Sequence, residues 1–394
     1  MQVKVKFLAA FAGLFLIGLQ SHARVFVVSS TQDATDPRSL RGAIIAANAL
    51  GGNNTIILRH GTYELNLYVY GVDEPPGYWG GLVITTGNLT IVGQANATIN
   101  ASGLVGRGVL DNSVFHISPN ARVRLENLIV TGGSGYGGGG IANEGTLELN
   151  NCKINGNFSG GFGGGGIYNS GSLSMFNCNV SDNSGGMGFS DNGGGIYNSG
   201  DLVMNDCIVR SNSTKAGLDG DYWGGWFNVG FIPGFSGENG GDGGGIYNTG
   251  NLSVNNSTLT GNACGSGGDG SDSYNDSAGN GGNGGSGGGI YNAGLLVMNR
   301  CTVENNSSGA GGNGGNSAHD AGGSPQQDGN GGNGGNGGGV FNVAGASEAK
   351  LIRTSVHLNS AGARGEPGAN GNLGLDGSGP NLFGDFTISR TTGR

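Results

Sequence analysis

The segment Gly-Gly-Gly-Ile-Tyr-Asn, or a close variant of it, returns along this chain in units of unequal length. A fixed motif carried by such units indicates stacked coils from which loops of variable length leave at one corner. This pattern constrains the shape of the chain strongly and leaves its chemistry open. The final asparagines of the copies are Asn143, Asn169, Asn198, Asn248, Asn292 and Asn342.

Apolar residues follow each central asparagine at fixed distances. In the unit of Asn198, Leu202 and Met204 lie four and six positions later, and Val209 lies eleven positions later. Steps of two are typical of strands. The alternation breaks at pairs such as Asn255-Asn256, which favour turns and tolerate left-handed backbone. Each unit therefore predicts three short strands separated by bends.

Three short strands per turn, stacked about 4.8 Å apart, describe a parallel β-helix, an all-β solenoid. Identical residues then lie above one another, so buried asparagine amides are expected to bond to those of the next coil. We interpret these asparagines as structural ladders. The first ladder contains the central asparagines, and the second contains Asn157, Asn183, Asn212, Asn262 and Asn306.

The N-terminus has the pattern of an export signal. Lys4 and Lys6 precede an apolar run, and small residues follow at 21–23, so residues 1–23 are predicted to be a signal peptide. The leader carries two lysines and no acid, so its removal lowers the formal net charge from −9 to −11, which argues against nucleic acid as a partner. We expect a secreted or cell-surface monomer with no transmembrane segment in the mature chain.

A cap is expected over residues 24–66, ahead of a β-helix over 67–394. Asp36 and Pro37 are typical of a helix start, which predicts a short helix over 37–49. Its apolar Leu40, Ala43 and Ile44 would cover the open end of the solenoid, because a bare first coil is an exposed strand edge.

Four cysteines occupy one repeat position. They are interpreted as free buried thiols, because residues in register on adjacent coils point in parallel, which is an awkward approach for a disulfide. Disulfides remain the alternative for an exported protein. Cys264 lies outside the pattern in a loop, where it would be a reactive thiol. The four are Cys152, Cys178, Cys207 and Cys301.

Long glycine-rich insertions at about 213–243, 263–287 and 307–337 leave from one corner. Insertions on one face are often the binding side of a repeat protein. All three end in a period of three, as in Asn330-Gly-Gly-Asn333-Gly-Gly-Asn336. This sequence pattern permits extended left-handed helices packed side by side and equally a flexible linker.

The stretch from Val25 to Leu65 resembles the N-terminal cap named for its CSLREA motif. The motif reads Arg38-Ser39-Leu40-Arg41-Gly42-Ala43 here, so its cysteine and glutamate are replaced. The segment HISPNARVRLENLIVTGG and the GGGIYN units are similar to right-handed parallel β-helix repeats, including those of polymorphic outer membrane proteins. The resemblance implies a right-handed coil and a place among adhesins and passenger domains.

No column of acidic or basic residues is found at the outward repeat positions that we compared. A lyase or glycoside hydrolase built on such coils needs clustered carboxylates. We therefore predict a non-catalytic protein of adhesion or surface binding, with no catalytic residues. The alternative is a polysaccharide-binding or polysaccharide-degrading protein like a pectate lyase. Binding to a crystal surface such as ice would need a flat regular array, and no threonine ladder is present.

Three weaker signals concern ligands. No cofactor or metal is expected, and only Ca²⁺ is considered, from loop fragments at 219–221 and 268–272 that are more typical of solvated loops. A column of outward tyrosines beginning at Tyr168 is either a sugar-stacking platform or an aromatic stack covered by loops. The densest aromatic patch is the candidate ligand-binding set, for a glycan or cell-surface ligand: Tyr222, Trp223, Trp226 and Phe227.

Overall fold

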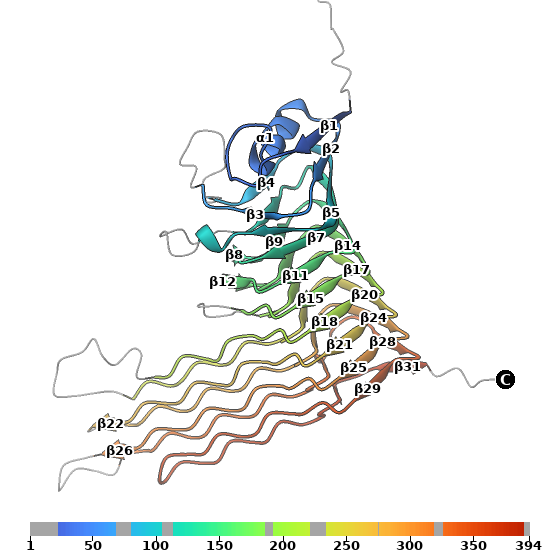
Figure 1. Ribbon diagram of the computed structural model, residues 1–394. Coiled ribbons are helices and arrows are strands. Elements are labelled where there is room, and N and C mark those ends of the chain that lie inside the picture. Colours follow the sequence, from blue (N-terminus) through green and yellow to red (C-terminus); the bar gives the residue numbers. More distant parts are fainter. Residues whose placement is uncertain are drawn as a thin grey trace, which may run out of the picture.

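The computed structural model describes residues 23–67, 80–104, 113–185, 192–220, 234–274, 276–318 and 326–389. These residues form a right-handed parallel β-helix whose coils stack from the N-terminal end to the C-terminal end (Figure 1). The fold predicted from the sequence is confirmed. In the described part of the chain, no helix is long and apolar enough to cross a membrane.

Each regular coil contains three short strands. In the coil of Asn198 these are β16 (Ile196–Asn198), β17 (Asp201–Asn205) and β18 (Ile208–Arg210). Each strand pairs in parallel and in register with its equivalent one coil further on, so that Asn198 lies beside Asn248. Repeat positions therefore become columns along the solenoid.

The strands that carry the GGGIYN motif belong to one sheet of the solenoid, which further strands without the motif extend at both ends. Its members are β4 (Leu82–Ile84), β6 (Phe115–Ile117), β9 (Ile141–Asn143), β13 (Ile167–Asn169), β16, β19 (Ile246–Asn248), β23 (Ile290–Asn292), β27 (Val340–Asn342) and β30 (Leu382–Phe383).

The other two strands of each coil build a larger sheet that bends along its length. Its members are β1 (Arg24–Val28), β2 (Asn53–Leu58), β3 (Thr62–Glu64), β5 (Gly87–Asn100), β7 (Ala121–Thr131), β10 (Thr146–Asn150), β11 (Lys153–Asn155), β14 (Ser172–Phe176), β15 (Asn179–Ser181), β17, β18, β20 (Asn251–Asn255), β21 (Thr258–Thr260), β24 (Leu295–Asn299), β25 (Thr302–Glu304), β28 (Ala349–Ile352), β29 (Ser355–His357) and β31 (Thr387–Ser389). Two small sheets pair β8 (Ser134–Gly137) with β12 (Phe158–Gly163) and β22 (Ser273–Tyr274) with β26 (Ser317–Ala318).

Left-handed residues make the bends between the strands. Asn151 and Asn256 have φ angles of 52° and 47°, as the asparagine pairs predict. The first glycine of the motif needs the same region, and Gly193 has a φ of +72°. A substitution there would be strained, which explains why each unit restarts with glycine.

Both asparagine columns lie inside the solenoid. In the first, Asn143 Nδ2 donates to Asn169 Oδ1 at 2.7 Å, and this bond repeats from coil to coil as far as Asn342. In the second, Asn157 Nδ2 donates to Asn183 Oδ1 at 3.0 Å, and the series continues past Asn306 to two asparagines of the last coils. Those additional members are Asn359 and Asn381.

A single α-helix among the described residues, α1 (Leu40–Leu50), covers the N-terminal end. The predicted start at Asp36 and Pro37 is wrong, because the cap is Ser39, whose hydroxyl accepts the N–H of Gly42. The Asp36 carboxylate is instead held by the main chain and side chain of Arg38. The helix nevertheless buries Leu40 and Ile44 against the first coils, as expected.

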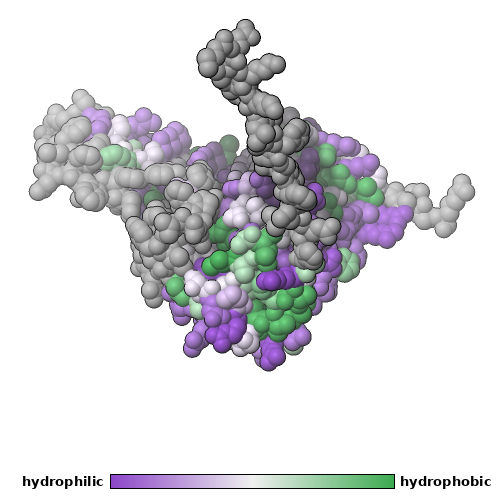
Figure 2. Space-filling view, turned by 90° about the horizontal axis from the view of Figure 1, so that it is seen from above, coloured by the Kyte–Doolittle hydropathy of each residue, from purple (hydrophilic) through white to green (hydrophobic). Residues whose placement is uncertain are grey.

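Figure 2 looks onto this end of the solenoid and shows hydrophobic residues gathered there. The side chains of Val25 and Val27 on β1 are 63% and 51% exposed, and Ile45 of α1 is 46% exposed. The helix thus covers the core of the first coil and leaves an apolar rim around it.

All five cysteines are free and buried. The expected reactivity of Cys264 is wrong, because its Sγ is buried against the glycine-rich segments and donates to the Ser286 carbonyl at 3.2 Å. Burial is the main reason that the pKa of this thiol is raised, so the reactive thiolate is disfavoured.

Candidate binding surfaces

The glycine-rich segments form a flat two-layer structure, which we call the plate. Outgoing legs run away from one corner of the solenoid, and return legs run back to it (Figure 1). The outgoing legs form one layer and the return legs form the other. The outgoing legs are 214–220, 264–274, 308–318 and 361–370, and the return legs are 234–243, 276–287, 326–337 and 371–379.

Each interior leg donates hydrogen bonds from its main-chain N–H groups to three neighbouring legs. The N–H of Gly281 donates to the carbonyl of Asn330 in the next return leg, and the N–H of Gly282 donates to Gly268 in an outgoing leg. The N–H of Asn283 donates to Asn239 Oδ1 in the preceding return leg at 2.8 Å. The pattern repeats every third residue, as expected for polyproline II helices packed side by side. The flexible-linker alternative is therefore wrong for the described legs.

Two glycines of each triplet face neighbouring legs at a distance that excludes a side chain. A Cβ on Gly282 would lie 1.9 Å from the carbonyl oxygen of Glu238, and one on Gly281 would lie 1.9 Å from that of Gly312. Larger residues replace these glycines near the outer tip, at the two edges of the plate, and at its base, where Cys264 and Ser308 begin two interior legs. The first edge has Lys215 and Leu218, and the last edge has Arg364, Pro367, Leu373 and Asp376.

The last edge is closed to a further leg. Pro367 has no N–H to donate, and the N–H of Arg364 donates to Asp376 Oδ1 at 3.0 Å. The last pair of legs was not predicted from the sequence, because these residues interrupt the glycine-rich triplets. The available signal was a glycine at every third position from Gly362 to Gly377.

The third residue of each triplet points out of the plate, so each layer presents one face. The outgoing legs present an acidic face that includes Asp219, Asp269, Asp272 and Glu366. The return legs present what we call the asparagine face. It consists of Ser236, Asn239, Asp242, Asn280, Asn283, Ser286, Asn330, Asn333, Asn336, Asn372, Leu375 and Ser378.

The possible Ca²⁺ fragment at 268–272 and residues 219 and 220 of the other belong to the outgoing legs, and Asp221 lies outside the described residues. The carboxylates of Asp219 and Asp269 accept main-chain N–H groups of the next outgoing leg at 2.8 and 2.7 Å. These carboxylate oxygens therefore link adjacent outgoing legs by hydrogen bonds. Among the described residues, no group of three or more His, Cys, Asp or Glu is arranged to hold a metal ion.

Asp242 is the only acid of the asparagine face and lies at its base. Its carboxylate accepts the N–H of Ser286 at 2.6 Å, but burial dominates and raises its pKa to about 6. The equivalent positions in adjacent coils hold Asn192 and Ser286, which are uncharged.

Replacement of Asp242 by asparagine is expected to stabilise the protein at pH 7.5 by about 1–2 kcal/mol, because the buried charge is removed and the acceptor oxygen is kept. A raised folded pKa means that the native state binds the additional proton, so the wild type loses stability as the pH rises from about 4 to about 6. Melting curves of both proteins between pH 4 and 8 measure this difference. Equal pH dependence in the two proteins would contradict it.

The tyrosine column lies on the outside of the motif sheet, close to the plate. The rings of Tyr168, Tyr197, Tyr247 and Tyr291 stack on one another with centroids 4.7–5.2 Å apart, and Phe341 and Phe383 continue the stack. Ring faces engaged in this way are not available to a sugar ring. The structure therefore favours the aromatic stack over the sugar-stacking platform.

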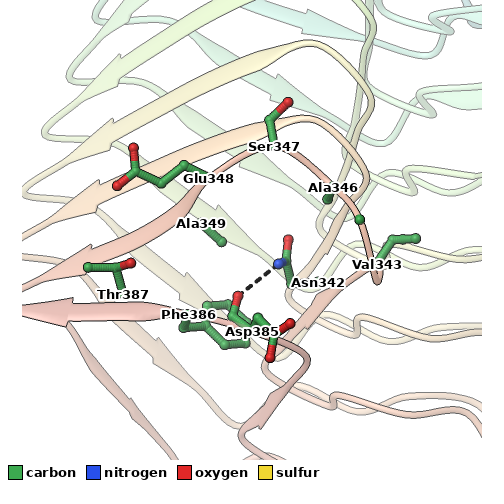
Figure 3. Close-up of a pocket in the computed structure, with 10 residues that line it drawn as sticks. Asn342, Val343, Ala346, Ser347, Glu348, Ala349, Asp385, Phe386 and Thr387 are labelled. Carbon is green, nitrogen blue, oxygen red and sulfur yellow. Dashed lines mark hydrogen bonds between the residues drawn. The ribbon is translucent and has the colours of Figure 1, made fainter.

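Two hollows lie elsewhere on the solenoid. A groove of about 280 Å³ at the bend of the larger sheet is lined by Asn151, Lys153, Asn177, Asn179 and Ile208, among others. A hollow of about 330 Å³ at the C-terminal end lies where Asn342, the last residue of its ladder, donates to the Asp385 carbonyl (Figure 3). Two acids, Glu348 and Asp385, line the C-terminal hollow, and Figure 3 shows their carboxylates directed away from each other.

The aromatic candidates Tyr222, Trp223, Trp226 and Phe227 lie outside the described residues. The described neighbours of that segment are the first outgoing and return legs. Among the residues that the structure describes, the ordered faces of the plate are the best-defined candidate surface.

No family model matches the chain, and no curated protein matches it. Among solved structures it is similar to pectate lyase Pel9A, with 14% identity and a TM-score of 0.35, over 76% of this chain and 78% of that one. It is also similar to the A-modules of two Azotobacter vinelandii mannuronan C-5 epimerases. AlgE4 gives 12% identity, a TM-score of 0.29 and coverage of 80% and 73%, and AlgE6 gives 12%, 0.27, 90% and 95%. At these identities the likeness concerns the parallel β-helix fold.

Proposed function

We propose that this chain is an exported, non-catalytic β-helix protein that binds or adheres to a surface, with the plate as its binding element. The observation that carries the proposal is the plate itself. Its legs present two flat faces of polar side chains, and both edges carry residues that mark where the array ends. Insertions of this kind on one side of a solenoid are commonly its binding side.

Rigidity supports a binding role for the plate. Each leg is fixed by main-chain hydrogen bonds to its neighbours, so little conformational entropy is lost when a partner is bound. A face of about a dozen ordered polar residues is suited to many weak contacts with an extended partner. It is less suited to a small molecule, which needs a concave and mostly apolar pocket.

The test incubates the purified chain with whole bacterial cells and with insoluble plant, fungal and bacterial wall fractions, and measures the protein that sediments with them. The same mixtures, and acidic polysaccharides with and without Ca²⁺, are assayed for new reducing or unsaturated ends. The proposal expects sedimentation with at least one surface and no new ends. Cleavage products would favour the polysaccharide-degrading alternative, and failure to sediment with any surface would overturn the proposal.

A further inference from the structure

The side-chain amides of the asparagine face are held in one orientation. Asn283 Oδ1 accepts the N–H of Asn333 at 2.9 Å, and Asn333 Oδ1 accepts the N–H of Leu375 at 2.8 Å. A main-chain N–H can donate only to the amide oxygen, so the NH₂ group of each asparagine must be the outer one.

These outer NH₂ groups are free donors. Among the described residues, no acceptor contacts the Nδ2 atoms of six asparagines of this face. Each NH₂ carries two hydrogen-bond donors. The six are Asn239, Asn280, Asn283, Asn330, Asn333 and Asn336.

The donors form a lattice. Successive asparagines along a leg are one polyproline II turn apart, about 9.3 Å, and equivalent asparagines on adjacent legs follow the spacing of the coils, about 4.8 Å. The interlocked glycines prevent this spacing from changing, because a leg cannot shift without breaking its bonds to neighbouring legs.

The chemistry of the face restricts its partner. It has no lysine or arginine, its one carboxylate lies at the base, and Leu375 is its one large apolar side chain. A polyanion would have no positive side chain to pair with on this face, and the chain's formal net charge of −9 would repel it. An apolar partner finds no patch. The matching partner is an uncharged, extended polymer rich in acceptor oxygens.

We propose that the asparagine face binds a neutral polysaccharide, whose hydroxyl and ring oxygens accept hydrogen bonds from the lattice of amide NH₂ groups. The inference rests on the proposed function, because it specifies which material the plate binds. Its specificity comes from many fixed donors acting together on one chain or on an ordered array of chains.

The chain provides a substitution that removes the donors and keeps the ladder. Ser236 Oγ and Ser286 Oγ accept the N–H groups of Asn280 and Asn336 at 3.2 and 3.1 Å, as asparagine oxygens do elsewhere. The double variant Asn283→Ser and Asn333→Ser therefore keeps an acceptor for each main-chain N–H and loses the two central NH₂ groups.

The matched control is made on the acidic face. Asn313 Oδ1 and Asn316 Oδ1 accept the N–H groups of Glu366 and Ala369, both at 3.0 Å. The double variant Asn313→Ser and Asn316→Ser makes the same chemical change on the opposite side of the same plate. Equal melting temperatures and circular dichroism spectra of the three proteins establish that the plate is retained.

The experiment measures depletion of each full-length protein by crystalline cellulose, chitin, insoluble β-1,3-glucan and xylan, at 0.1 M and 0.5 M NaCl, with alginate as the anionic comparison. We expect the wild type to bind at least one neutral polymer with little dependence on salt. The asparagine-face variant should bind it at least tenfold more weakly, and the acidic-face variant should bind it as the wild type does.

Three results would overturn the inference. They are wild-type binding to none of the neutral polymers, equal binding by both double variants, and binding to alginate alone that is lost in high salt. Inhibition of ice recrystallisation that only the asparagine-face variant loses would reassign the face to a crystal surface and overturn it as well. If the chain sediments with cells and binds no neutral polymer, the proposed function survives and this inference fails.

Discussion

The Asn262→Ala variant is expected to lose about 3–5 kcal/mol of the free energy of unfolding. Asn262 is completely buried. Its Oδ1 accepts from both the main-chain N–H and the side-chain Nδ2 of Asn212, and its Nδ2 donates to Asn306 Oδ1 and to the Val209 carbonyl. The variant leaves these buried partners unsatisfied, and each such group costs about 1–3 kcal/mol.

Urea unfolding followed by far-ultraviolet circular dichroism measures the loss. The matched control is Asn251→Ala in the same coil, where the side chain is exposed and bonds only to exposed Asp201. The control should change stability by less than about 0.5 kcal/mol. A loss below about 1 kcal/mol for Asn262→Ala would contradict the structural role of the ladder. If the Asn262→Ala variant does not fold, the Asn262→Ser variant is used instead. Faster hydrogen exchange at the Asn212 main-chain N–H than in the wild type then measures the loss of the ladder bond.

The Gly312→Val variant is expected to separate the plate and abolish surface binding, with a fall of more than about tenfold in the association constant. A Cβ on Gly312 would lie 2.0 Å from the carbonyl oxygen of Gly268. The leg of Gly312 cannot move away without breaking the bond from the Gly312 N–H to the Gly282 carbonyl, and the leg of Gly268 is held by the bond from the Gly282 N–H to the Gly268 carbonyl. The local cost is at least about 3 kcal/mol, the upper range for an overpacked interior.

Limited proteolysis and sedimentation with the bound surface measure this effect. The control is Ala310→Val in the same leg, where the side chain is directed away from the other layer. We expect new cleavage sites within the legs of Gly312→Val and none in Ala310→Val. Because the ladders and the core lie in the coils, the melting temperature of the solenoid should change by only a few degrees. Unaltered surface binding by Gly312→Val would show that the plate is not the binding element.

The solenoid could be predicted from the sequence, because equivalent positions of successive repeats stack directly above one another in successive coils. Once Leu202 and Met204 alternate in one unit, and equivalent residues alternate in the next, stacking in register buries all of them. The helix start was predicted wrongly, because Asp36 resembles a cap. Its carboxylate is engaged by Arg38, a contact that the spacing of residues does not reveal.

The plate could be predicted only in part. The period of three permits packed polyproline II helices, yet it cannot say whether legs from different coils align. That outcome depends on hydrogen bonds between residues roughly fifty positions apart, such as Asn330 N–H with Asn280 Oδ1. The last legs were hidden because edge residues such as Arg364 and Leu373 can replace glycine only where no further leg packs.

The measurement that tests the central claim most directly is amide hydrogen exchange of the wild type over residues 276–287 and 309–316. In these legs the three N–H groups of a triplet such as 281–283 all donate to neighbouring legs. The account predicts protection by orders of magnitude relative to an unstructured glycine-rich chain. Exchange at the rates of a flexible chain would show that the plate does not exist in solution. It would contradict both the proposed function and the proposal that the asparagine face binds a neutral polysaccharide.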